Sequence, residues 1–96
     1  MTQNSEQKIQ IRDSFAGSEY ANNLLVSHNK EEFMLTFLNI VGPSGRVVGK
    51  IMATPSNLKK MAKVLEDSLK KYETLFGQVE EAPTPKQEIG FRTEQQ

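Results

Sequence analysis

Apolar residues gather in three short stretches in the first half of the chain and then recur at helical spacing in one longer stretch. The short stretches run from Tyr20 to Ser27, from Glu32 to Val41 and from Arg46 to Ala53. Each has a strand's length, and turn-forming residues separate them, so the pattern predicts three strands joined as an antiparallel meander. The sequence therefore predicts an α+β fold in which this meander precedes one long C-terminal helix.

Two connections in the predicted sheet carry strong turn signals. The segment 27–31 contains Asn29, the residue there that best tolerates a positive φ. The segment 42–45 reads Gly-Pro-Ser-Gly and predicts a hairpin loop, because the glycines permit unusual φ values and the proline fixes the bend.

The helix has clear signals at both ends. Thr54 is suited to cap it, Pro55 fits the first helical position, and Gly77 predicts a left-handed stop after Phe76. A helix of about 22 residues is roughly 33 Å long. One side of it is apolar. Its residues are Leu58, Ala62, Leu65, Leu69, Tyr72 and Phe76, and Met61, Val64 and Leu75 widen it.

The middle and third strands are apolar on both faces, which is typical of strands buried on both sides. One face presents Phe33, Leu35 and Phe37, and we expect Val47 and Ile51 beside them. A single helix covers only one face of such a sheet, so the other face needs a second cover. Its five large residues represent on the order of 10 kcal/mol on burial. This predicts a homodimer through that face, with an N-terminal arm folded across it as the alternative; the predicted self-association residues are Met34, Leu38, Ile40, Val48 and Met52.

The polar ends of the chain predict three parts. Residues 1–18 form a flexible arm, in which the alternating segment 8–12 is consistent with a short edge strand. Residues 19–78 form the β-β-β-α domain. Residues 79–96 contain prolines and glutamates with few apolar residues, which predicts a disordered tail.

The composition of the chain bears on its partners and its cellular location. The chain has 96 residues and twelve charges of each sign, so its net charge gives no long-range attraction to nucleic acid or anionic lipid. It lacks cysteine, which fits the cytoplasm. No apolar run approaches the ~20 residues of a membrane span. A folded core of about 60 residues is marginal by itself, which favours a partner subunit.

Several segments resemble a small family of bacterial and archaeal proteins known as a domain of unknown function (number 3467). The resemblance covers about residues 19–78 and implies a compact, strand-rich domain with a long C-terminal helix. It implies no activity, substrate or cofactor, so no functional residue is carried over. The matching segments are Tyr20-Ala21-Asn22, Val26-Ser27-His28, Glu32 to Phe37, Met52 to Pro55, Leu69 to Glu73 and Phe76-Gly77.

Candidate chemistry is sparse. His28 is the single histidine and lies in a predicted turn, and the loop 42–46 joins two strands, unlike a phosphate-binding loop. We therefore expect no catalytic, cofactor or metal site, and a non-enzymatic, oligomeric protein-binding adaptor. The alternative is a nucleic-acid-binding or regulatory protein that uses the helix lysines, although acidic residues lie among them. The residues of this alternative site are Lys59, Lys63 and Lys70.

Overall fold

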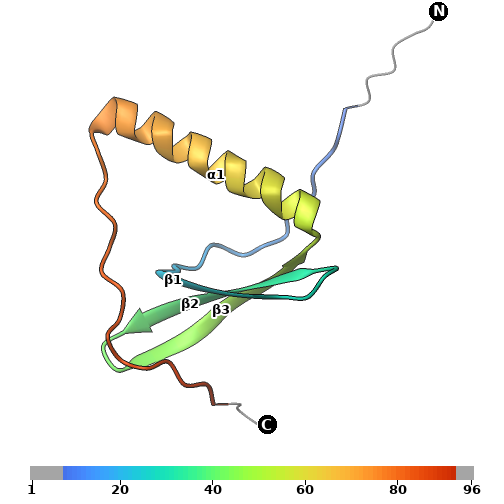
Figure 1. Ribbon diagram of the computed structural model, residues 1–96. Helices are drawn as coiled ribbons and strands as arrows, with labels where there is room; N and C mark the ends of the chain where they lie inside the picture. The colour runs from blue at the N-terminus through green and yellow to red at the C-terminus, as the bar shows by residue number, and fades with distance from the viewer. Residues whose placement is uncertain (1–7, 93–96) are drawn as a thin grey trace, which may run out of the picture. The chain divides into compact units, whose positions relative to one another are not determined.

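The computed structural model describes residues 8–92, and the chain divides into two compact units, Met1–Leu58 and Lys59–Gln96. The first unit contains a three-stranded sheet in the order β1-β2-β3 (Figure 1). The strands are β1 (Asn23–His28), β2 (Phe33–Val41) and β3 (Ser44–Ala53), and the helix α1 spans Pro55–Phe76. This confirms the predicted meander followed by one C-terminal helix.

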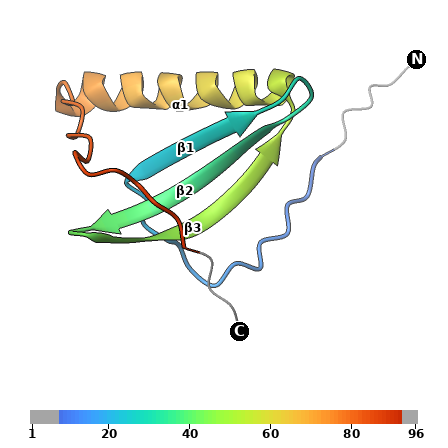
Figure 2. The ribbon, with the colours of Figure 1, turned by 60° about the horizontal axis from the view of Figure 1, so that its bottom comes forward.

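The strands pair antiparallel with their neighbours in the sequence and lie side by side (Figure 2). Strand β2 lies in the middle, and its Leu38 and Thr36 are the buried side chains among residues 8–92, with 4% and 8% of their surfaces exposed. The most buried side chains of the described residues therefore lie on the middle strand.

The turn between β1 and β2 depends on the side chain of Asn29. Its Oδ1 accepts hydrogen bonds from the backbone N–H groups of Glu31 and Glu32, at 2.8 and 2.9 Å. The expectation of a positive φ at Asn29 is wrong, because glycines alone have positive φ among residues 8–92. The side chain supplies the turn's hydrogen bonds, so the backbone needs no left-handed residue.

The hairpin between β2 and β3 is tighter than the sequence predicts. Gly42 has a φ of +61°, and Pro43 follows it, which places glycine at the first central position as in a type II′ turn. A two-residue turn lets pairing begin at Ser44, opposite Val41, and the predicted third strand therefore gains two residues at its start.

Helix α1 begins and ends where the sequence predicts. The Oγ1 of Thr54 accepts a hydrogen bond from Asn57 N–H at 3.3 Å, which is the expected N-cap contact. Gly77 has a φ of +105°, and its N–H donates to the Glu73 carbonyl at 2.9 Å. This is the left-handed stop that the glycine predicts.

The segment before β1 is attached to the sheet without being a strand. Residues 8–12 form no strand, and β1 begins at Asn23 instead of at Tyr20. Here the side chain of Asn22 takes the place of the backbone hydrogen bonds between two strands. Its side chain donates to the Ile40 carbonyl and accepts from Ile40 N–H, both at 2.9 Å, and its backbone N–H donates to the Leu38 carbonyl. A side-chain amide offers the same donor and acceptor as a peptide group, so it pairs with β2 as a strand residue would.

Candidate functional site

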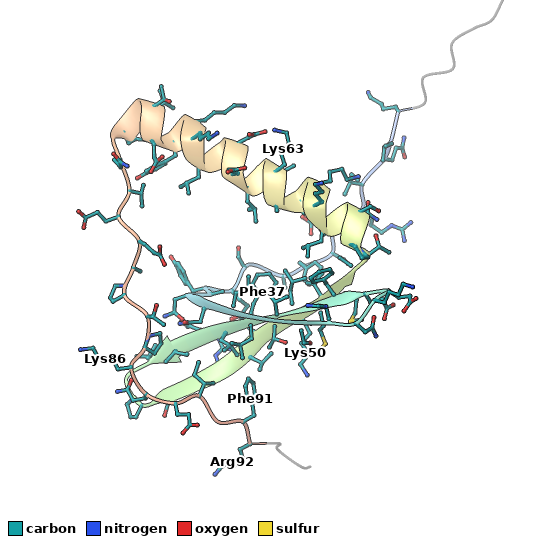
Figure 3. All side chains as sticks on the ribbon, in the orientation of Figure 1. Phe37, Lys50, Lys63, Lys86, Phe91 and Arg92 are labelled. Atoms are coloured by element: carbon teal, nitrogen blue, oxygen red, sulfur yellow. The ribbon has the colours of Figure 1, made fainter. Side chains whose placement is uncertain are left out.

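The register divides the sheet into two faces, because residues paired directly across antiparallel strands lie on the same face. The first, here called the Phe37 face, is apolar in its middle and also carries His28, the partner of Phe33, and the pair Asn39 and Arg46. Among its apolar members, Leu24, Val26 and Ile51 are each about half exposed. Phe37 and Lys50 lie on opposite sides of the sheet (Figure 3). The large apolar residues of the Phe37 face are Leu24, Val26, Phe33, Leu35, Phe37 and Ile51.

The opposite face, here called the Leu38 face, contains the residues predicted for self-association. Met34 pairs with Met52, and Leu38 and Ile40 follow on the same side of β2. The structure therefore brings together the predicted set. Polar residues share this face, however, and interrupt its apolar surface: Asn23, Ser27, Thr36 and Lys50.

A β-bulge corrects the predicted position of Val47. Phe37 pairs with Gly49 and Leu38 with Val47, so Val48 has no partner on β2. The sequence analysis placed Val47 on the Phe37 face by simple alternation. An extra residue in one strand shifts the alternation by one, and Val47 therefore lies opposite Leu38.

Exposure differs strongly within the predicted self-association residues. Leu38, at their centre, is 4% exposed and is thus buried within a single chain, whereas Met52 is 55% exposed. Met34, Ile40 and Val48 are half-buried. Self-association through this face stays a prediction, and the freely exposed apolar surface available to it is small.

Helix α1 presents a larger exposed apolar surface than either sheet face. None of its residues is buried, and Leu65 and Phe76 are each 72% exposed. The rings of Tyr72 and Phe76 lie 4.9 Å apart, one helical turn from each other. We call the six most exposed of these residues the apolar stripe: Val64, Leu65, Leu69, Tyr72, Leu75 and Phe76.

The alternative site on the helix is a mixed-charge surface. Lys59, Lys63 and Lys70 lie on one side of α1 by their spacing, and Figure 3 shows Lys63 projecting from the helix. The Nζ of Lys63 lies 3.6 Å from a carboxylate oxygen of Asp67. An acidic partner within this row reduces the positive potential that a phosphate backbone would meet.

Polar side chains at the end of α1 serve the helix terminus. A depression here is lined by Lys70, Glu73, Thr74 and Gln78. Glu73 accepts a hydrogen bond from Val79 N–H, and Thr74 donates to the Lys70 carbonyl, each at 3.0 Å. These contacts satisfy backbone groups near the end of the helix, so they carry no indication of a ligand.

The predicted turn histidine is accounted for by packing. The ring of His28 lies 4.8 Å from the ring of Phe33, its partner across the β1–β2 ladder. Within residues 8–92, no three His, Cys, Asp or Glu side chains come together in an arrangement that would hold a metal ion. In the same range, no helix combines the length and the apolar character needed to cross a membrane.

Two contacts before β1 escaped the sequence analysis. Besides the Asn22 bonds, a carboxylate oxygen of Glu19 lies 2.7 Å from the Arg46 guanidinium on β3. Asn22 borders β2 and Glu19 reaches β3, so the segment is attached to both strands. A polar residue directly before a predicted strand was the available signal for Asn22. Nothing in the sequence indicates which arginine Glu19 meets.

Comparison with known proteins gives one match. The model of a family described as "Protein of unknown function (DUF3467)" matches residues 1–81. No curated protein and no solved structure matches the chain. The match confirms the resemblance and corrects its start, which the sequence analysis set at residue 19. The arm is polar apart from the short alternating segment 8–12, so its residues gave no reason to extend the resemblance to it.

Proposed function

Because the chain belongs to this DUF3467 family, which brings no assigned activity, we propose a function from its own surfaces: it is a non-enzymatic module that binds proteins and assembles with copies of itself. The observation that supports this proposal is the apolar stripe of α1. Its residues are between half and three quarters exposed.

The area of this surface is that of apolar patches which often have a function. Six large apolar side chains at this exposure present on the order of 500 Å² of apolar surface, within the range of the largest patches on monomers, which are often functional. Burial of that area corresponds to about 12 kcal/mol before the costs of association. A domain this small has a total stability of roughly 5–15 kcal/mol, so the gain is comparable with the whole.

The chemistry of the surface favours a protein partner. An aromatic pair among leucines on a rigid helix is the composition of helix-in-groove and helix-on-sheet interfaces. The side of the helix that carries Lys59, Lys63 and Lys70, by contrast, also contains Asp67, which pairs with Lys63. The cytoplasmic location stays a prediction from the cysteine-free sequence.

Light scattering across a concentration series tests the proposal. The expected result is a mass of two or more chains at micromolar concentration, nearly unchanged between low and physiological salt, because apolar burial responds weakly to ionic strength. The variant Leu65→Glu, on the stripe, should reduce the mass to that of one chain. Lys63→Glu is the matched control on the same helix and should leave the mass unchanged.

Two results would contradict the proposal. The first is a folded monomer at high micromolar concentration. The second is nucleic-acid binding that weakens steeply with salt and is lost in Lys63→Glu, since that response is the signature of phosphate contacts and would support the alternative function.

A further inference from the structure

The two edge strands of the sheet differ in how well they resist further pairing. Strands β1 and β3 lie at the edges (Figure 2), and each has backbone groups that face away from β2. On β3, the bulge at Val48 and the charged side chains of Arg46 and Lys50 hinder the addition of another strand. The six residues of β1 include no lysine, arginine, acidic residue, proline or bulge. Strand β1 is therefore the edge that is open to pairing.

The outer edge of β1 requires a partner with an extended backbone. Among residues 8–92, the backbone groups of β1 form hydrogen bonds with β2 alone. Its apolar side chains are also accessible, since Leu25 is 37% exposed and Leu24 and Val26 are about half exposed. A row of backbone donors and acceptors at the spacing of a strand is matched only by another extended chain.

The arm that precedes β1 contains a segment of this kind. Residues 8–12 read Lys-Ile-Gln-Ile-Arg and alternate with the period of a strand, yet they form no strand within the single chain. Ile9 and Ile11 are both more than 80% exposed. The segment and β1 belong to the same unit, Met1–Leu58, and the family match begins at residue 1 and so includes the arm. The unit thus contains both an unpaired edge and an unpaired segment with a strand pattern.

Charge favours β1 over β3 as the partner of this segment. Lys8 and Arg12 place a positive charge at each end of it. Lys50 on β3 has the same sign, and like charges on neighbouring strands destabilise their pairing. Strand β1 has no such charge, and the turn that follows it, residues 29–32, has one more acidic than basic side chain.

The contacts of the arm direct it away from the open edge of its own chain. Asn22 is bonded to Ile40 on β2, and Glu19 contacts Arg46 on β3, so the chain before β1 crosses toward the opposite edge. The seven residues from Arg12 to Glu19 span up to about 23 Å when extended. A three-stranded sheet measures only about 10 Å between its outer strands. The segment therefore extends past its own sheet, and the matching edge is that of a second copy.

Two ways of pairing copies through β1 differ in the extent of their contact. Pairing of β1 with the β1 of another copy engages six residues of each chain, whereas a standard interface has roughly 20–30 residues a side. Reciprocal addition of the two segments engages both β1 and residues 8–12 of each chain, which nearly doubles the contact. A reciprocal contact of this kind has two-fold symmetry and closes at two copies.

We infer that residues 8–12 of each chain form a fourth strand on the outer edge of β1 of the other chain. The inference rests on the proposed self-assembly and adds a second contact to that of the apolar stripe. Antiparallel pairing is the more stable per residue. With Ile9 opposite Val26 and Ile11 opposite Leu24, the isoleucines extend the apolar middle of the Phe37 face.

Cross-linking between single-cysteine variants tests the added strand, and the natural chain has no cysteine to interfere. Chains of two distinguishable lengths carry Ile9→Cys and Val26→Cys, are unfolded together, refolded and oxidised. Opposite residues of antiparallel strands have Cα atoms about 4.5–5.5 Å apart, which a disulfide spans. The mixed disulfide should exceed by about tenfold that of the control, Gln10→Cys with Val26→Cys, because the side chain of Gln10 points to the other face of the strand. A product with Ile11→Cys in place of Ile9→Cys would support the added strand in a register shifted by two residues.

Other products would overturn the inference. Equal yields from Ile9→Cys and Gln10→Cys would show contact without the alternation of a strand. Disulfides mainly between two Val26→Cys chains would show that β1 pairs with β1. In a chain that carries both Ile9→Cys and Val26→Cys, closure on itself without covalent dimer would show that the arm pairs with its own β1. A wild-type dimer without the mixed disulfide would contradict the added strand alone, whereas a wild-type monomer in light scattering would contradict the proposed self-assembly as well.

Substitution of the two isoleucines gives an independent test. The double variant Ile9→Ser and Ile11→Ser should raise the dissociation constant of the assembly by about tenfold or more, because both side chains become buried in the added strand. Phe15→Ser is the matched control, since this apolar residue of the arm is 90% exposed and lies outside residues 8–12. It should leave the dissociation constant unchanged. Sedimentation across a dilution series measures the three constants, and equal values for the double variant and the wild type would contradict the inference.

Discussion

The burial of Leu38 gives a sharp prediction for the stability of the sheet. Leu38 lies on the middle strand with 4% of its surface exposed, opposite Val47 and beside the unpaired Val48. Leu38→Ala removes a buried side chain and leaves a cavity, which typically costs 2–5 kcal/mol. A chain of this size belongs near the low end of the 5–15 kcal/mol range of stability, so the loss is about half of the total.

Urea unfolding followed by circular dichroism measures this loss. With a urea dependence of about 1–1.5 kcal/mol per molar, a loss of about 3 kcal/mol lowers the midpoint by about 2–3 M. Both proteins are compared at the same concentration, because assembly adds to apparent stability. The matched control is Val41→Ala on the same strand, where the side chain is 71% exposed and the midpoint should hardly move.

Equal midpoint shifts in the two variants would refute the reasoning, because they would mean that Leu38 is no more buried in solution than Val41. Leu38→Glu goes further. Since the side chain is buried within one chain, we expect this variant to unfold, because an unpaired carboxylate is too costly to bury.

Three further predictions concern local features. Asn22→Ala removes both hydrogen bonds to the Ile40 backbone and should lower the free energy of unfolding by about 1–2 kcal/mol. Hydrogen exchange at Ile40 N–H should become faster, and unchanged protection of that group would contradict the strand-like role of Asn22. Gly77→Ala should lower stability by about 1 kcal/mol through backbone strain at a φ of +105°. A Cβ at this position meets no atom within 4 Å, so a steric clash does not contribute. An unchanged thermal midpoint would argue against the left-handed stop. Lys63→Glu breaks an exposed pair with Asp67 and should change stability by less than about 1 kcal/mol; a larger loss on urea unfolding would mean that the pair matters to the fold.

The ends of α1 show how well local signals work. Thr54-Pro55 and Gly77 act through their own backbone preferences and through groups within one turn of the helix, so the sequence contains all the information needed. The three strands were found for the same reason, since their apolar content and the turns between them are local. Their first residues were less certain, because the limits of a strand depend on what its partner offers.

The sequence by itself determined the order of elements, the helix with its apolar stripe, and the two-sided apolar character of β2. Only the tertiary structure decided the register, the bulge that turns Val47 to the Leu38 face, and the pairing of Asn22 with Ile40. The physical reason is the distance along the chain between the residues that interact. Helix caps and glycine turns are settled between residues a few positions apart, whereas a register, a bulge and an ion pair such as Glu19–Arg46 join segments that meet only after the sheet has formed.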